Sequence, residues 1–201
     1  NHLKGFIVDG TITIEARIKL KNVMGIKELT QFDFSAPSVG TDLILRVEGK
    51  DVHVGRQYLT THSPVFAAMF YGDFIEKEKA EIELKDVKYE EFIDLLHVIY
   101  PSGRAVNFDT YKPILALADF YQIKFARDQV ESYLIRTELV KMHEKIELAD
   151  QYRLKQLQYF CLQSFKTVHQ IKELHSEGRL DSLSESMQAA LHARTMELPL
   201  E

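Results

Sequence analysis

Residues 42–70 decide the fold, and they read DLILRVEGKDVHVGRQYLTTHSPVFAAMF. Apolar and polar side chains alternate in residues 43–47 and again in residues 52–54. The residues between them, 48–51, are EGKD, a polar stretch with a glycine that suits a turn. Because alternation with a period of two places every second side chain on one face of a strand, this pattern predicts a β-hairpin.

A helix is expected directly after this hairpin region. Serine is a favoured N-cap residue and proline is favoured at the first helical position, so Ser63-Pro64 predicts a helix start. Apolar side chains follow at helical spacing as far as Phe70, and Gly72 then interrupts the pattern. The helix is therefore predicted to carry an apolar face.

Residues 81–87 are predicted to form a short strand and residues 89–100 a helix, whose first turn contains Glu90 and Glu91, where the helix dipole favours acidic groups. Pro101-Ser102-Gly103 ends that helix. The rest of the chain is helical in pattern, with predicted helices at 110–121, 124–135, 138–149, 154–167 and 184–194. Since strands come early and helices late, the predicted fold class is α+β.

The N-terminal part of the chain reads differently. Residues 11–20, TITIEARIKL, alternate cleanly and predict a half-buried antiparallel strand, for which we find no obvious pairing partner nearby in the sequence. Because a lone strand is unstable, its sheet partners are expected upstream of Asn1. Periodicity is lost in residues 21–41, where we expect a linker at residues 25–40.

The composition of the chain excludes several classes of partner. A net charge of −5 over 201 residues favours neither nucleic acid nor an acidic membrane surface. No apolar run is long enough for a membrane span, and the first residues do not form a signal peptide. Cys161 is the only cysteine, which excludes an intrachain disulfide and fits the cytoplasm or the nucleus. The chain does not begin with methionine, which fits a fragment of a longer protein.

The sequence contains no complete motif for catalysis, metal binding or cofactor binding. His143-Glu144 begins like the helical zinc motif, but position 147 is glutamate where that motif needs a second histidine. There is no phosphate-binding or dinucleotide-binding glycine pattern and no nucleophile elbow. Cys161 lies on the apolar side of a predicted helix, where we expect a buried, inert thiol. His62 and His97 are expected to pack rather than to bind metal, so we predict a protein that is not an enzyme and has no cofactor.

Several segments, in order and correctly spaced, resemble the BTB/POZ domain. They are residues 42–47, 52–54, 59–70, 82–87, 92–100 and 114–119. The resemblance covers residues 41–136 and implies a small mixed sheet flanked by helices.

The segments on either side of this region carry a further resemblance. Residues 146–154, IELADQYRL, with Leu157 and Cys161, look like the 3-box and shortened BACK helices that follow BTB domains in ubiquitin-ligase adaptors, so we assign residues 137–201 to this part. Residues 1–24 are similar to the last strand of a MATH domain. The whole protein would then be a MATH–BTB adaptor of the speckle-type POZ kind.

This resemblance implies binding to the N-terminal helices of cullin-3, with the upstream MATH domain capturing a protein substrate for ubiquitination. The family's φ-x-E contact motif falls on Phe74, Ile75 and Glu76. An exposed aromatic ring would anchor the partner, and the carboxylate would orient it. Four residues are weaker candidates for the same surface: Phe70, Tyr71, Asp73 and Tyr100. A core position is the alternative for Phe70.

Two departures from the family pattern bear on function. The family often pairs an aspartate in the first strand with a histidine near the end of the hairpin; here Asp42 is present, but Gly55 stands at the histidine position, and Arg56 is the alternative partner. The segment before Asp42 lacks strong helix signals, although many BTB domains carry a dimerising helix there. The resemblance still implies a homodimer. The alternative function is a self-association scaffold or corepressor-binding module without a cullin contact.

Overall fold

The structure is a computed structural model of the chain. It describes residues 7–8, 11–12, 32–72, 81–176, 178 and 181–199. A three-stranded mixed sheet consists of β3 (Leu43–Val47), β4 (Lys50–Val54) and β5 (Glu81–Leu84) in the order β4-β3-β5. Strands β3 and β4 are antiparallel, whereas β3 and β5 are parallel. This mixed sheet confirms the predicted α+β class.

The hairpin is confirmed, with a tighter turn than predicted. Val47 pairs with Lys50, so only Glu48 and Gly49 form the loop. Their φ angles are +49° and +76°, both in the left-handed region that a two-residue hairpin loop uses. Gly49 adopts this backbone without the steric cost that a Cβ atom imposes.

Two short helices follow the hairpin, α1 (Arg56–His62) and α2 (Pro64–Tyr71). The predicted start of α2 is confirmed, because the Ser63 hydroxyl accepts a hydrogen bond from the Phe66 N–H at 3.0 Å. Helix α1 was not predicted from the sequence. It buries only Leu59, and its N-cap residue is a glycine without a side chain to cap the helix, so its sequence carries little helix signal.

The predicted strand at residues 81–87 is shorter than expected. Strand β5 ends at Leu84, and Asp86 has a φ of +59°, which turns the chain out of the sheet. Helix α3 (Tyr89–Ile99) agrees with its prediction. Beyond it come α4 (Tyr111–Phe120) and α5 (Lys124–Arg136), which are packed against each other.

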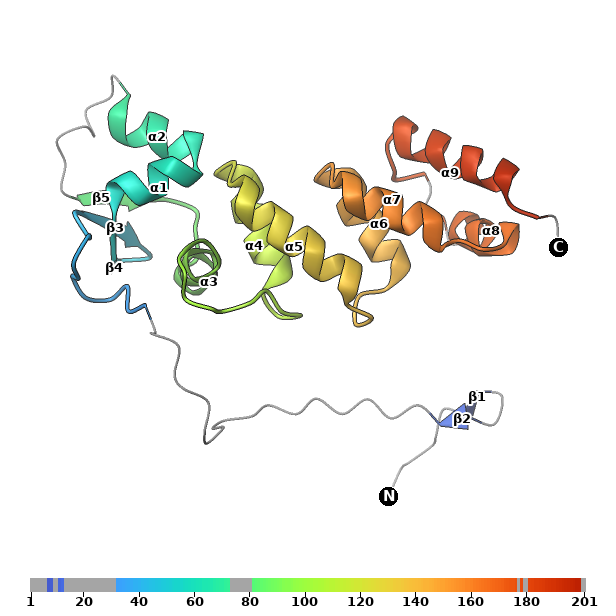
Figure 1. Cartoon of the computed structure of the whole chain (residues 1–201), viewed down its shortest axis with the longest axis horizontal. Coiled ribbons are helices and arrows are strands. Elements are labelled where there is room, and N and C mark those ends of the chain that lie inside the picture. Colours follow the sequence, from blue (N-terminus) through green and yellow to red (C-terminus); the bar gives the residue numbers. More distant parts are fainter. Residues whose placement is uncertain are drawn as a thin grey trace.

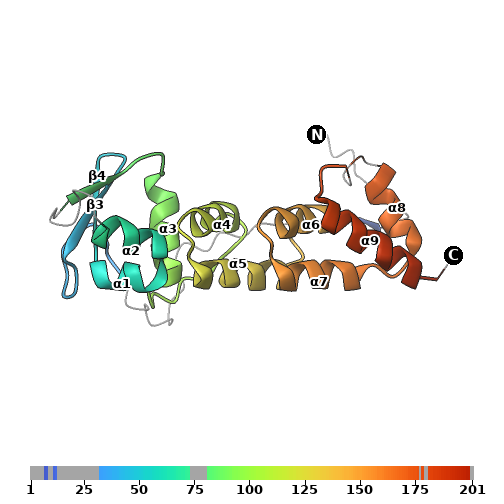
Figure 2. The same ribbon diagram turned by 90° about the horizontal axis from the view of Figure 1, so that it is seen from above.

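The C-terminal part of the described chain is helical, as predicted. Its helices are α6 (Met142–Gln151), α7 (Lys155–Ser164), α8 (Val168–Ser176) and α9 (Glu185–Glu197). Helix α8 had not been predicted, and α6 begins after the predicted residue 138. Figures 1 and 2 show an elongated molecule, with the sheet, α1 and α2 at one end, α8 and α9 at the other, and the α4–α5 and α6–α7 pairs between them.

Residues before β3 differ from the predicted linker. Phe34 is only 5% exposed and lies in the core, and its carbonyl accepts a hydrogen bond from the His53 N–H of β4 at 2.8 Å. Burying a phenylalanine side chain contributes about 1.5–3 kcal/mol, so residues 32–34 are part of the folded unit. Residues 25–31 of the predicted linker lie outside the described residues.

A two-stranded hairpin lies near the N-terminus. Strand β1 (Ile7–Val8) pairs antiparallel with β2 (Thr11–Ile12), which corrects the expectation that no partner exists nearby in the sequence. The missed signal was Asp9-Gly10 between two apolar stretches, a favoured two-residue hairpin loop. Residues 13–20 of the predicted strand lie outside the described residues.

Candidate functional site

The φ-x-E segment lies in the connection between α2 and β5. Its residues Phe74, Ile75 and Glu76, together with Asp73, are outside the described residues, and their role stays a prediction. Helix α2 ends at Tyr71, followed by Gly72, whose N–H donates to the Ala68 carbonyl at 2.9 Å. The described surface at the end of α2 therefore lies next to this segment along the chain.

The two candidates at the end of α2 lie in different environments. Phe70 is fully buried and stacks on Phe66 with ring centroids 5.4 Å apart, which is the core position allowed as its alternative. Tyr71 is 48% exposed, and its hydroxyl donates to Gln57 Oε1 at 3.4 Å. Successive helical residues point about 100° apart, which allows Tyr71 to reach solvent although Phe70 is buried. Tyr71 is thus the candidate on this helix that a partner can reach.

Two exposed phenylalanines at the corner between α4 and α5 were not predicted as contacts. Phe120 is 67% exposed and Phe125 is 45% exposed. The Ser63 hydroxyl donates to the Tyr121 carbonyl at 2.6 Å, which ties this corner to the first turn of α2. We call Phe120 and Phe125 the corner pair. Large exposed aromatic side chains are enriched among binding hot spots, and this tie brings the corner pair to the helix that carries Tyr71.

The corner that carries the exposed rings is itself packed into the core. Tyr121 is 2% exposed and stacks on Phe66 with ring centroids 4.4 Å apart. Burial raises the pKa of Tyr121 to about 12, so this ring stays neutral. The sequence stretch DFYQIKF, residues 119–125, has more apolar side chains than one helix face can bury, and this excess was the available signal for the corner pair.

Tyr100 belongs to another cluster of rings. It lies at the end of α3, and its hydroxyl accepts a hydrogen bond from the Gly55 N–H at 3.2 Å. Its ring centroid is 4.3 Å from that of Tyr58 and 5.1 Å from that of Phe34. Burial raises the pKa of Tyr100 to about 12. The contacts of Tyr100 are thus with α1 and with the segment before β3.

Position 55, where the family often has histidine, is glycine in this chain for a steric reason. A Cβ atom at this position would lie 2.7 Å from the Gly40 carbonyl oxygen, closer than real Cβ contacts. Asp42 Oδ1 instead accepts a hydrogen bond from the Arg56 backbone N–H at 2.6 Å. Arg56 is therefore a partner of Asp42, through its main chain at the start of α1. The carboxylate supplies the helix cap that glycine lacks.

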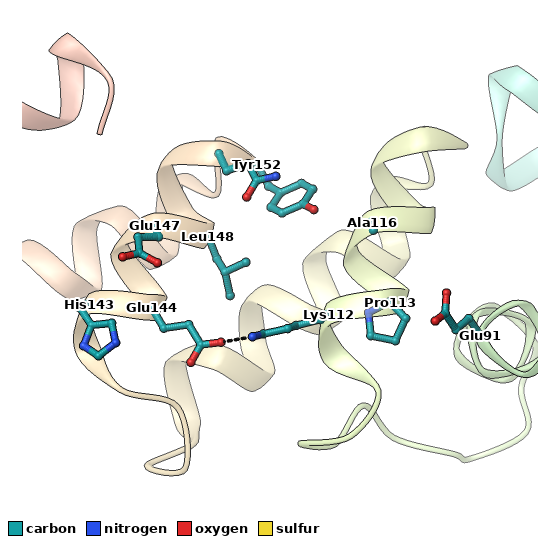
Figure 3. Close-up of a pocket in the computed structure, with 10 residues that line it drawn as sticks. Glu91, Lys112, Pro113, Ala116, His143, Glu144, Glu147, Leu148 and Tyr152 are labelled. Carbon is teal, nitrogen blue, oxygen red and sulfur yellow. Dashed lines mark ion pairs between the residues drawn. The ribbon is translucent and has the colours of Figure 1, made fainter. Parts of the chain in front are cut away.

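A groove of about 610 Å³ lies between α4 and α6, with Glu91 of α3 at its edge (Figure 3). Glu144 accepts hydrogen bonds from Lys112 Nζ at 2.6 Å and from the Tyr111 hydroxyl at 2.7 Å. Burial raises the pKa of Glu144, but these two hydrogen bonds outweigh it and lower the pKa below its usual value. The remaining lining residues are Pro113, Ala116, His143, Glu147, Leu148, Gln151 and Tyr152. Acidic groups beside apolar ones suit a segment with basic and small apolar side chains.

The groove keeps its shape because α5 holds the corner between α6 and α7. Arg127 Nη2 donates to the Tyr152 carbonyl at the C-terminal end of α6 at 2.5 Å. One turn further along α5, Glu131 Oε1 accepts from the N–H groups of Gln156 and Leu157 in the first turn of α7, at 2.7 and 2.9 Å. A cation at a helix C-terminus and an anion at an N-terminus are both favoured by the helix dipole. We call Arg127 and Glu131 the corner clamp.

The described residues offer little for catalysis. Within these ranges no group of three or more His, Cys, Asp and Glu side chains is arranged to hold a metal ion. Cys161 is 1% exposed, and burial raises the pKa of its thiol to about 12, although Lys145 lowers it, which confirms a buried thiol. His97 is 5% exposed and meets Phe34 edge-on, as a packing residue does. None of the helices in the described ranges is long and apolar enough to cross a membrane.

The mixed sheet, the Ser63-capped helix and the α3–α5 helices agree with a comparison of the sequence with family models. The model of the BTB/POZ domain matches residues 33–138. The chain belongs to the BTB/POZ family. The match begins one residue before Phe34, in agreement with the packing of this segment on β4.

The names of known relatives of this BTB/POZ chain include a second domain, the MATH domain. BTB and MATH domain-containing protein 38 of Caenorhabditis elegans is 34% identical over 194 residues, which cover 96% of this chain and 50% of the relative. BTB and MATH domain-containing protein 36 of the same species is 35% identical over 194 residues, covering 96% of this chain and 61% of that relative. The chain spans little more than half the length of these relatives. The BTB domain of zebrafish PATZ1 is a similar solved structure, with 20% identity and a TM-score of 0.41, covering 48% of this chain and 77% of that one.

Proposed function

We propose that this chain is an adaptor, not an enzyme, and that its BTB domain binds cullin-3 in a RING ubiquitin ligase. Three exposed aromatic side chains support the proposal: Tyr71 at the end of α2, which precedes Phe74 and Glu76 in the sequence, and the corner pair, whose corner is bonded to Ser63 at the start of α2. Aromatic side chains contribute strongly to binding when a partner removes them from water. A carboxylate at the edge of such a surface selects the partner's orientation.

The remainder of the proposal concerns the rest of the protein. A MATH domain outside this chain would capture the protein substrate, as the names of the relatives suggest. The corner clamp would hold α6 and α7 in a fixed position relative to the BTB domain, so that a cullin could contact both parts together. We further propose that the chain works as a homodimer in the cytoplasm or the nucleus.

The proposal is tested by isothermal titration calorimetry of residues 1–201 with an N-terminal fragment of cullin-3. We expect binding by the wild-type chain and a loss of about 30-fold or more for Phe74→Ala, because truncation of a central anchor costs about 2 kcal/mol or more. Phe125→Ala is expected to weaken binding by a smaller factor. Met196→Ala is the matched control, since this exposed apolar residue lies on α9 at the far end of the molecule (Figure 1).

The same titration separates the alternative function. A chain that self-associates tightly, measured by analytical ultracentrifugation, and gives no heat with cullin-3 would be a self-association scaffold or a corepressor-binding module. If the Phe74→Ala, Glu76→Ala double variant still binds cullin-3, the adaptor role is retained, but Phe74 and Glu76 are not the contact residues.

A further inference from the structure

A cavity of about 270 Å³ lies between the segment before β3, helix α1 and the end of α3. Four aromatic rings surround it: Phe32, Phe34, Tyr58 and Tyr100. We call it the aromatic cavity. Its other lining residues are Asp33, Ser38, Val39, Gly40, Thr41, His53, Gly55 and Pro101. The cavity is distinct from the groove between α4 and α6 and from the surface around Tyr71, since it shares no lining residue with them.

The four rings line this space and also pack on one another. Tyr100 lies at the centre of the group, with ring centroids 5.4 Å from Phe32 and 4.3 Å from Tyr58, and with interplanar angles of 59° and 35°. The Tyr58 hydroxyl donates to the Ile99 carbonyl at 2.6 Å, and the Tyr100 hydroxyl accepts from the Gly55 N–H. Both hydroxyls are thus engaged by the backbone. Burial raises the pKa of both tyrosines, so the rings stay neutral.

A negative charge lies at the same cavity. The Asp33 carboxylate accepts hydrogen bonds from the Ser35 N–H at 2.9 Å and from the Ser35 hydroxyl at 2.6 Å. These bonds lower the pKa of Asp33, and the carboxylate is therefore ionised at neutral pH. No lysine or arginine is among the described residues that line the cavity. A cation is favoured here over an anion, first by the ring faces and then by this carboxylate.

We propose that the aromatic cavity binds a methylated lysine side chain of a partner protein. Ring faces attract a cation, and methyl groups remove the N–H donors that would otherwise stay unpaired among the rings. A choline headgroup carries the same methylated ammonium, but its phosphate would approach Asp33 with no lysine or arginine among the lining residues to neutralise it. The protein ligand is therefore preferred over the lipid. This site is separate from Tyr71 and the corner pair, but it includes Tyr100, one of the weaker candidates for the cullin-3 surface.

The segment that carries the cavity is held firmly in place. The Phe34 ring is buried against His97 and Tyr100, and its carbonyl is bonded to β4. Gly55 allows the Gly40 carbonyl to approach closely on the opposite wall. A preformed cavity binds a small group with little loss of conformational freedom.

The test is a titration of residues 1–201 with three capped amino-acid amides, followed by NMR. The first probe is trimethyl-lysine, the second is unmodified lysine, and the third is the neutral analogue in which carbon replaces the ammonium nitrogen. We expect trimethyl-lysine to bind about tenfold more tightly than either of the others. Equal binding of the neutral analogue would overturn the proposal, because the cavity would then be an apolar pocket only. Absence of binding by trimethyl-lysine would overturn it as well.

Two variants locate the binding. Phe32→Leu keeps apolar volume but removes a ring face, and Asp33→Asn removes the charge while keeping an acceptor for Ser35; both are expected to weaken trimethyl-lysine binding several-fold. Tyr159→Leu, at an exposed ring on α7, is the control and is expected to bind as the wild type does. Wild-type affinity in Asp33→Asn and in a folded Phe32→Leu would contradict the assignment. Phosphocholine that binds as tightly as trimethyl-lysine would overturn the choice of a protein ligand.

Discussion

Glu131 shows how one buried carboxylate connects two parts of the molecule. It is 6% exposed and lies on α5, the last helix of the region that matches the BTB/POZ domain. Its carboxylate accepts from two N–H groups at the start of α7, which have no partners within their own helix. A buried charge is tolerated because these two donors satisfy it.

Replacement of Glu131 by alanine is therefore expected to destabilise the chain by about 1–3 kcal/mol, since buried N–H groups lose their acceptor. Glu131→Gln keeps an acceptor oxygen and is expected to cost less. The measurement is chemical denaturation followed by circular dichroism. Glu90→Gln is the control, because that side chain is 81% exposed and pairs only loosely with Lys50. Equal stability of Glu131→Ala and the wild type would show that the contact to α7 contributes nothing.

The Cys161 thiol is expected to resist alkylation in the folded protein. The reactive species is the thiolate, and a pKa of about 12 leaves almost none of it at pH 8. Labelling with iodoacetamide, followed by mass spectrometry, is expected to be slow in buffer and fast in denaturant. Labelling in buffer at the rate of the unfolded chain would contradict the buried position of this thiol.

At the scale of elements, Ser63 performs two tasks at the start of α2. Its hydroxyl caps the helix and also bonds the Tyr121 carbonyl at the corner of α4 and α5. Ser63→Ala removes both bonds at a buried site and is expected to cost about 1–3 kcal/mol. Ser184 also makes two bonds, because its hydroxyl caps α9 and donates to Asp150 Oδ1 of α6, but its position is exposed, so Ser184→Ala is expected to cost less. Thermal unfolding of the two variants gives the comparison, and the reverse order would contradict the tie between α2 and the corner.

The junction between α4 and α6 is expected to weaken in acid. The pKa of Glu144 is lower in the folded chain than its ordinary value of 4.5, so the folded state binds this proton less readily than the unfolded state does. The contribution of Glu144 is complete above pH 4.5 and is lost as the pH falls through the lower folded pKa. Unfolding free energies measured from pH 6 to pH 3 are expected to fall less steeply for Glu144→Gln. Parallel curves for the two proteins would contradict this.

Most elements could be predicted because their signals are local. The hairpin, α2 and α3 follow from alternation, capping and helical spacing within the elements themselves. Helix α1 was not predicted because its cap comes from Asp42, which lies just before β3 and far from α1 in the sequence. The buried position of Phe34 was not predicted because residues 32–34 are held by their contact with β4. So short a segment shows no periodicity in the sequence. Helix α8 did carry a signal, with buried apolar residues at Val168, Ile171 and Leu174.

The candidate site could be predicted only in part for a similar reason. Tyr71 could be predicted from its place just before the φ-x-E segment in the sequence, whereas the corner pair is linked to α2 only through the contact of Ser63 with Tyr121. The rings of the aromatic cavity come from positions as distant in sequence as Phe32 and Tyr100, so their meeting depends on the sheet and α3 together. The excess of apolar residues in 119–125 indicates exposed rings at the corner, but no single stretch of sequence indicates which distant residues these rings or those of the cavity lie close to.

At the scale of the whole molecule, the corner clamp is expected to make the BTB domain and the helices α6 and α7 unfold together. Removal of both side chains in an Arg127→Ala, Glu131→Ala double variant is expected to separate the melting curve into two steps, because the carbonyl of Tyr152 and the N–H groups of α7 lose their partners on α5. Differential scanning calorimetry checks this. A single transition at the wild-type temperature would contradict the coupling.

We propose that cullin-3 binds Tyr71, the corner pair and the segment that contains Phe74 and Glu76. The most direct measurement is calorimetric titration of the N-terminal fragment of cullin-3 into the wild-type chain and into the Phe74→Ala, Glu76→Ala double variant, with Met196→Ala as the control. We predict binding by the wild type and by Met196→Ala, and none that can be measured for the double variant. Equal affinity for all three proteins, or no binding by the wild type, would contradict the claim.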